Sequence, residues 1–138
     1  MQVIESLKKN PEAKNTDLFV FSDGCKYVDD NDKVNELRSF LKTVKGFKSV
    51  KIFERKTNYG LGINLIDGIT RILETYDRVI VLEDDIVVNT NFLAFMNQCL
   101  TKYKDNKDMF TIQATTGNPN ASADVICRKQ PNCWGWAI

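Results

Sequence analysis

The chain has 138 residues, of which 43% are hydrophobic and 27% charged, a composition that fits a globular protein and argues against disorder. Its 19 basic and 18 acidic residues give a net charge of +1, so there is no general electrostatic attraction for nucleic acid. The absence of histidine excludes histidine acid–base chemistry, and no apolar run reaches the length of a membrane span.

Helical and extended patterns alternate in the first half of the chain. Residues 1–9 resemble the end of an amphipathic helix, and the apolar run 17–21 predicts a buried strand that stops at Ser22-Asp23-Gly24. Apolar residues at three- and four-residue steps predict a helix from Asp32 to Val44, with Asp30 or Asn31 as its cap. Residues 50–54 predict the next strand.

The second half continues the alternation. A helix is predicted from Gly60, with an apolar stripe formed by Ile63, Ile66, Ile69, Ile72 and Leu73. The apolar run 78–82 then predicts a strand that leads directly into three acids. A helix over 92–103, capped by Asn89 or Thr90, and strands over 109–114 and 125–128 complete the pattern.

This order predicts an α/β fold with three layers and a mostly parallel sheet, in one domain over residues 1–138. The helix at the start would normally follow a strand, so we expect the first strand to be missing and the chain to be a segment of a larger protein. An incomplete sheet leaves an open edge, which also predicts self-association.

The acids Glu83, Asp84 and Asp85 are the strongest chemical signal in the sequence. Three neighbouring carboxylates repel one another unless a cation or a group of donors balances them. Their hard oxygen atoms suit Mg²⁺ or Mn²⁺, and the carboxyl end of a strand is where open α/β sheets bind ligands. The alternative is a solvated strand end. If the strand continues through the acids, Asp84 and Asp85 point to opposite sides.

Two further segments are expected at the same edge of the sheet. One is Asp23-Gly24, and the other is the loop 58–62, in which Gly60 and Gly62 let backbone approach a ligand closely. The loop has neither a P-loop nor a dinucleotide-binding pattern, and an ordinary helix start is the alternative reading.

Four motifs together give the chain a resemblance to GT-A glycosyltransferases, which are nucleotide-sugar-dependent enzymes. They are Phe21-Ser22-Asp23-Gly24, the segment 58–64, the segment 81–86 with Asn91-Phe92-Leu93 after it, and the segment 133–137. The resemblance covers residues 1–138 and is nearest to bacterial family-2 sugar transferases and the N-acetylglucosaminyltransferase I group. It implies transfer of a hexosyl or N-acetylhexosaminyl group from a nucleotide-diphosphate sugar, expected to be a UDP-sugar.

The resemblance also implies roles on the nucleotide side of the site. Asp23 would bond the base or ribose, while Asn58, Gly60 and Asn64 would line the nucleotide pocket. Glu83-Asp84-Asp85 would be the family's DxD-type motif.

On the metal and acceptor side, the resemblance implies that Asp84 faces the ribose or sugar and that Asp85 holds Mn²⁺ or Mg²⁺. Trp134, Gly135 and Trp136 would form the floor of the sugar or acceptor pocket, with core packing as the alternative for both tryptophans. No catalytic base is assigned, since Asp124 is the one carboxylate after Asp108 and nothing favours it.

The expected acceptor is a glycan or a lipid-linked molecule in cell-envelope polysaccharide biosynthesis, reached from the cytoplasm at the inner face of the membrane. Two other classes remain open. One is a Mg²⁺-dependent nucleotidyltransferase, which also uses acids to hold the ion. The other is a non-catalytic, flavodoxin-like interaction module, which would not need the Trp motif.

Overall fold

The computed structural model describes residues 1–114, 129 and 134–138. The chain divides into two compact units, one made of Met1–Asn10 with Arg78–Ile138 and the other of Pro11–Asp77. The described strands form two sheets, one in each unit. The mixed α/β class is therefore confirmed, and the strand predicted over 125–128 lies outside the described residues.

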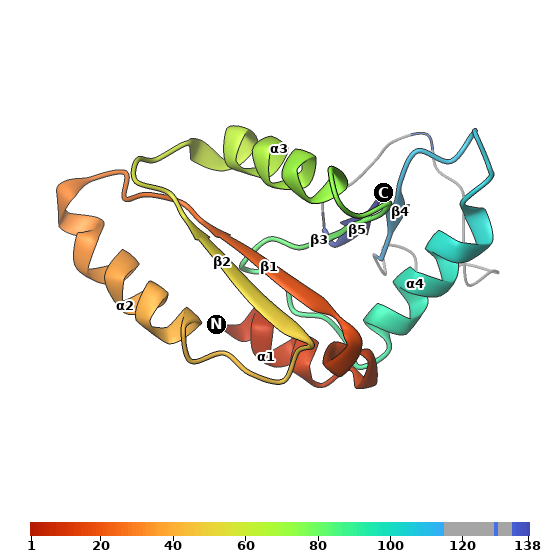
Figure 1. The fold of residues 1–138 in the computed structure, drawn as a ribbon, viewed down its shortest axis with the longest axis horizontal. Helices are drawn as coiled ribbons and strands as arrows, with labels where there is room; N and C mark the ends of the chain where they lie inside the picture. The colour runs from red at the N-terminus through yellow and green to blue at the C-terminus, as the bar shows by residue number, and fades with distance from the viewer. Residues whose placement is uncertain (115–128, 130–133) are drawn as a thin grey trace. The chain divides into compact units, whose positions relative to one another are not determined.

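The unit Pro11–Asp77 is built on two parallel strands, β1 (Asp17–Ser22) and β2 (Ser49–Glu54). The connection between them contains α2 (Asn31–Leu41), and β2 is followed by α3 (Gly60–Leu73). The two helices flank the strands from opposite sides (Figure 1). Short 3-10 helices at Pro11–Asn15 and Val28–Asp30 precede β1 and α2. The strands β1 and β2 and the helices α2 and α3 were each predicted at nearly the same residues, whereas the two 3-10 helices were not predicted.

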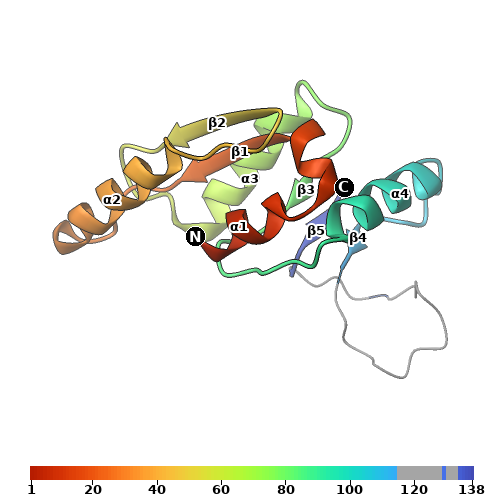
Figure 2. The same cartoon turned by 90° about the horizontal axis from the view of Figure 1, so that it is seen from below.

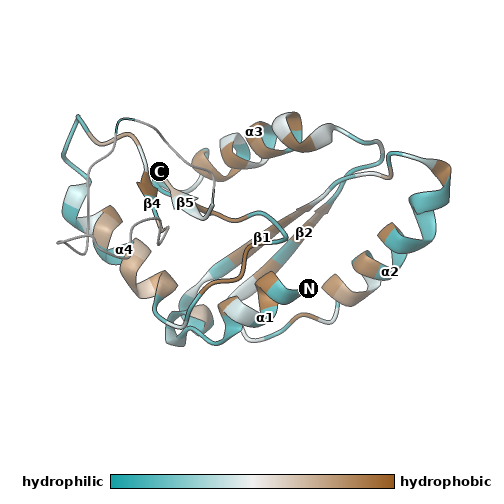
Figure 3. Ribbon diagram, turned by 180° about the vertical axis from the view of Figure 1, so that it is seen from behind, coloured by the Kyte–Doolittle hydropathy of each residue, from teal (hydrophilic) through white to brown (hydrophobic). Residues whose placement is uncertain are grey.

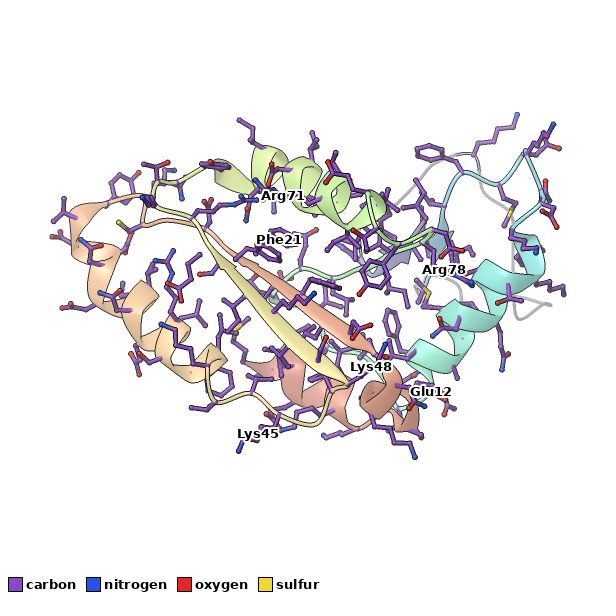
Figure 4. All side chains as sticks on the ribbon, viewed as in Figure 1. Glu12, Phe21, Lys45, Lys48, Arg71 and Arg78 are labelled. Atoms are coloured by element: carbon purple, nitrogen blue, oxygen red, sulfur yellow. The ribbon has the colours of Figure 1, made fainter. Side chains whose placement is uncertain are left out.

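Aromatic side chains fill the space between β1, β2 and α3. Phe21 stacks on Phe53 of the neighbouring strand, with ring centroids 4.7 Å apart, and Phe19 meets Tyr76 edge-on at 5.5 Å. Phe21 points from β1 toward α3 (Figure 4), where a Cβ atom on Gly68 would lie only 3.0 Å from its ring. The ring therefore packs directly on the backbone of the helix at Gly68.

The predicted apolar stripe of α3 is confirmed at Ile72 and wrong at Ile63 and Ile66. Gly68 and Ile72 are the buried residues of the helix, whereas Ile63 and Ile66 are 64% and 68% exposed. The reason is that the Phe21 ring fits only where the helix lacks a side chain, and this turns Gly68 toward the strands. Figure 3 shows hydrophobic residues on α3 as well as on β1 and β2.

The other unit combines α1 (Gln2–Lys8) and α4 (Phe92–Tyr103) with three very short strands. These are β3 (Ile80–Val81), β4 (Ile112–Gln113) and β5 (Trp136–Ala137), and β5 lies in the middle, antiparallel to both neighbours. Figure 2 shows α4 beside this small sheet. The buried apolar residues of the unit are Val3, Ile4, Leu7, Val81, Phe92, Leu93, Met96, Cys99, Leu100 and Ala137.

Two local predictions for this unit are corrected. The strand expected over 78–82 is shorter, because regular pairing with β5 covers only Ile80 and Val81. The helix cap expected at Asn89 or Thr90 is Asn91, whose side chain makes no capping bond. None of the helices among the described residues is both long and apolar enough to cross a membrane.

Candidate functional site

Asp23 is the first residue after β1, and its carboxylate binds the start of α3. Oδ1 accepts hydrogen bonds from the backbone N–H of Gly24 at 2.9 Å and of Tyr59 at 2.8 Å. Oδ2 accepts one from the N–H of Gly60 at 2.9 Å. Asp23 thus supplies the cap that α3 lacks from its own N-cap residue, whose side chain makes no such bond.

Gly24 lies in close contact with the segment that leads into α3. A Cβ atom here would be 2.4 Å from the carbonyl carbon of Thr57, closer than any side chain allows. Asn58 Nδ2 also donates to the carbonyl oxygen of Gly24 at 2.8 Å. The structure therefore brings Asp23, Asn58 and Gly60 together at the carboxyl end of the two parallel strands.

Arg55 organises this end of the unit, and the sequence analysis did not single it out. Its side chain is 8% exposed, and the guanidinium donates from Nε to Asn64 Oδ1 at 3.1 Å and forms an ion pair with Asp67. The hydrogen bond from Arg55 holds the pKa of Asp67 below its usual value. Both polar atoms of the Asn64 amide are hydrogen-bonded, because its Oδ1 accepts from Arg55 and its Nδ2 donates to the Phe21 carbonyl at 3.1 Å. Asn64 is thus engaged in positioning α3 on β1.

Arg38 is a second arginine that sequence reasoning missed. From α2 it donates to the Ser22 hydroxyl at 3.2 Å and to the carbonyl oxygens of Asp23 at 3.1 Å and Arg55 at 2.8 Å. One guanidinium therefore joins the ends of both strands. The sequence does contain one indication that Arg38 is half-buried. Arg38 follows Val34 by four residues and therefore lies on the apolar side of the predicted helix.

The three acids lie in a turn of the other unit. The N–H of Ile86 donates to the Glu83 carbonyl at 3.3 Å, which leaves Asp84 and Asp85 at the exposed middle of the turn. The strand pattern does not continue through the acids, so the condition under which Asp84 and Asp85 would point to opposite sides of a strand is not met. Both carboxylates instead project from one turn.

The acidic turn has the chemistry of a cation site. Within the described part of the chain, Glu83, Asp84 and Asp85 have no hydrogen-bond or ion-pair partner for their side chains. Across residues 1–114, 129 and 134–138, no three acidic or cysteine side chains are close enough together to form a complete metal site. Adjacent unbalanced carboxylates are nevertheless suited to a hard divalent ion.

The Trp motif borders the acidic turn. Trp136 of β5 pairs with Val81 of β3, and a Cβ atom on Gly135 would lie 3.2 Å from the Leu82 side chain. Gly135 also has a φ of +71°, a conformation that other residues rarely adopt, so a side chain here would be strained as well as crowded. Trp134 is exposed, while Trp136 is half-buried.

The predicted site residues therefore form two groups. Asp23, Asn58, Gly60 and Asn64 belong to the unit Pro11–Asp77, whereas the acidic turn and the Trp motif belong to the other unit. Each group is assembled within its own unit from segments that are distant in sequence. Asp124 lies outside the described residues.

Comparison with known proteins gives no family assignment: no protein-family model, curated protein or solved structure matches this chain.

Proposed function

We propose that this chain is the nucleotide-sugar-binding part of a metal-dependent glycosyltransferase of the GT-A type. The observation that carries the proposal is the pairing of β3 with β5, which sets Gly135 against Leu82 and so places the Trp motif beside Glu83-Asp84-Asp85. Acids for a cation and aromatic rings for a sugar are the two features that such a site needs, and they are adjacent here.

In this proposal, the unit Pro11–Asp77 would bind the nucleotide. Its two parallel strands and flanking helices are consistent with a three-layer nucleotide-binding sheet, and Asp23 follows β1 at the edge where such sheets bind ligands. The carboxylate of Asp23 already accepts three N–H bonds, and oxygens with two lone pairs each leave room for a further donor from a base or ribose.

The metal would be held by Asp85, with Glu83 and Asp84 beside it. When bound, Mn²⁺ or Mg²⁺ stabilises the charge on the leaving diphosphate as a Lewis acid. Asp84, next to Asp85 in the same turn, would accept hydrogen bonds from the ribose or the transferred sugar. The turn keeps both carboxylates exposed, so the ion and the donor could reach them from solvent.

Trp134 and Trp136 would bind the sugar or the acceptor. An indole face packs well against the apolar side of a sugar ring, and Trp134 presents much of its surface to solvent. A glycan or lipid-linked acceptor, reached from the cytoplasm at the inner face of the membrane, belongs to the same proposal.

Calorimetric titration with UDP, in the presence and absence of Mn²⁺, tests the proposal. We expect binding that requires Mn²⁺ and is lost in Asp85→Ala. Asp105→Ala is the matched control, because Asp105 is an exposed acid outside the turn, and it should bind as the wild type does.

GDP, CDP and dTDP would be titrated in the same way, because the base of the donor is not fixed by the site. Absence of metal-dependent binding for all four nucleotides would rule out the glycosyltransferase proposal. Binding of nucleoside triphosphates in preference to diphosphate sugars would instead favour a Mg²⁺-dependent nucleotidyltransferase.

A further inference from the structure

The ring of Tyr59 is held in a fixed position by its surroundings. The Arg55 guanidinium lies over the ring, 4.8 Å from its centroid, and Arg55 is itself fixed by Asn64 and Asp67. The backbone N–H of Tyr59 donates to Asp23 at 2.8 Å. Both the backbone and one face of the ring are therefore restrained by buried or hydrogen-bonded groups.

Tyr59 nevertheless remains 41% exposed. Since Arg55 covers one face of the ring, this exposure belongs mainly to the other face and the ring edge. A tyrosine whose role was only to pack on Arg55 would gain from burying that second face, and Phe21 already packs on the same guanidinium at 5.4 Å.

The space beside Tyr59 is also open. A Cβ atom on Gly60 or on Gly62 would meet nothing within 4 Å. Gly62 lies inside α3, where glycine is destabilising relative to alanine, and no contact within the described residues explains why a side chain is missing. The φ of +72° already explains the glycine at position 60, whereas room for a ligand next to the ring accounts for Gly62.

We infer that Tyr59 is the platform on which the base of the donor nucleotide stacks. The inference rests on the proposed function and adds a base-binding residue to it. A flat, immobilised π-face matches a flat base, and such stacking tolerates any base. Asp23, the residue proposed to bond the base or ribose, is the same residue that anchors the Tyr59 backbone, so stacking and hydrogen bonding would act on one end of the ligand.

The experiment compares a nucleotide with its base-free counterpart. UDP and ribose 5-diphosphate would each be titrated with Mn²⁺ into the wild type, Tyr59→Phe and Tyr59→Leu. Tyr59→Phe keeps the aromatic face, and Tyr59→Leu keeps apolar bulk without it. Thermal unfolding of each variant checks that α3 is intact, and saturation-transfer NMR on the uracil protons detects binding too weak for calorimetry.

Tyr59→Leu should lower the affinity for UDP by about tenfold to a hundredfold, as expected for one stacked base. Its affinity for ribose 5-diphosphate should match that of the wild type, and Tyr59→Phe should bind both ligands normally. Equal losses for the two ligands would show a purely structural role and overturn the inference, as would unchanged UDP binding in Tyr59→Leu. If the wild type bound no nucleotide by either method, the proposed function and this inference would fall together.

Discussion

The side chain of Asn10 caps a helix that begins more than eighty residues later in the chain. Its Oδ1 accepts the N–H of Leu93 at 3.0 Å, and its Nδ2 donates to the carbonyl of Asn89 at 3.0 Å. Nearby, the Ser6 hydroxyl accepts the N–H of Val88 at 3.1 Å. Polar groups from α1 and from Asn10, two residues beyond the helix, thus bond the backbone at the start of α4, and α1 becomes an integral part of this unit.

Asn10→Ala should destabilise the protein by about 1–3 kcal/mol, because it leaves the buried N–H of Leu93 without the side-chain acceptor that it has in the wild type. Asn10 is only 2% exposed, so water cannot easily replace the lost side chain. Urea unfolding monitored by circular dichroism gives the free energy of unfolding. Asn35→Ala is the control, since Asn35 is exposed on α2 and should change stability little. Equal effects of the two substitutions would contradict the capping role.

Gly24→Ala should separate Asp23 from the start of α3. The new methyl group would overlap the carbonyl carbon of Thr57, which is backbone and cannot rotate away, so the segment has to shift. We expect a loss of stability of about 1–3 kcal/mol, as for other overpacked sites, together with weaker nucleotide binding.

Gly62→Ala is the matched substitution for Gly24→Ala, because its methyl group meets no protein atom. It should stabilise α3 by about 0.5–1 kcal/mol through helix propensity alone. The two glycine variants should therefore change the melting temperature in opposite directions. Destabilisation by both would show that the open space beside Gly62 is misassigned.

The elements of this fold could be predicted from local patterns, whereas several contacts could not. α4 appears at the expected residues because burial of one face of the helix determines its periodicity, and β1 appears where its apolar run predicts a strand. The stripe of α3 was misplaced because Gly68, which has no hydrophobicity to detect, is the residue that faces the Phe21 ring. Which face of a helix packs can depend on the partner's shape as well as on its apolar residues.

In the candidate site, too, some features could be predicted from the sequence and others could not. Proximity of Asp23 to Asn58 and Gly60 followed from parallel strands ending at one edge. The anchoring role of Arg55 did not, because its partners Asn64 and Asp67 lie on the following helix and leave no periodic signal at Arg55, and the position of Arg38 on the apolar side of α2 did not identify the backbone carbonyls that it bonds. The acids were expected at the end of a strand over 78–82, and regular pairing with β5 stops at Val81, so the strand is shorter than its apolar residues indicate.

Asp17 should give the protein a stability component that is lost in acid. Hydrogen bonds from Ser49 and then Lys48 lower the pKa of its carboxyl from the usual 3.8. A lowered pKa in the folded state stabilises the fold above the unfolded pKa, and the contribution disappears as the pH falls through the folded value. The stability difference between wild type and Asp17→Asn should thus be constant from pH 8 to 5 and shrink below about pH 4.

The contribution of Lys48 to stability should be lost at high pH, opposite to that of Asp17. Its pKa is raised by the hydrogen bond to Asp17, so its contribution is complete below the unfolded pKa and is lost as the pH rises through the folded value. Unfolding curves of Lys48→Met and the wild type should therefore converge only in strong alkali. Asp32→Asn, which changes an exposed acid on α2, serves as the control for general charge effects. A pH-independent difference for Asp17→Asn would show that Asp17 acts through packing.

The rate of backbone amide hydrogen exchange along β1 should alternate between slow and fast from one residue to the next. The bond from the Arg55 N–H to the Ser22 carbonyl, together with the register of β1 on β2, turns the backbone N–H groups of Leu18 and Val20 toward β2. Those of Phe19 and Phe21 face the other edge, and β2 is the one strand that pairs with β1 among the described residues. In dilute solution the Leu18 and Val20 amides should exchange slowly and the Phe19 and Phe21 amides rapidly.

This alternation also tests the self-association expected from an open sheet edge. The centre of β1 carries no charge, proline or glycine, which are the features that normally prevent edges from pairing. If copies of the chain pair through β1, the Phe19 and Phe21 amides should become protected as concentration rises, in step with the mass measured by light scattering. Protection of both amides at concentrations where the chain is monomeric would show that the edge is covered within one chain. If the mass stayed that of a monomer and the Phe19 and Phe21 amides exchanged rapidly at every concentration, pairing through β1 would be excluded. The free edge of β1 would then be exposed in a monomeric chain.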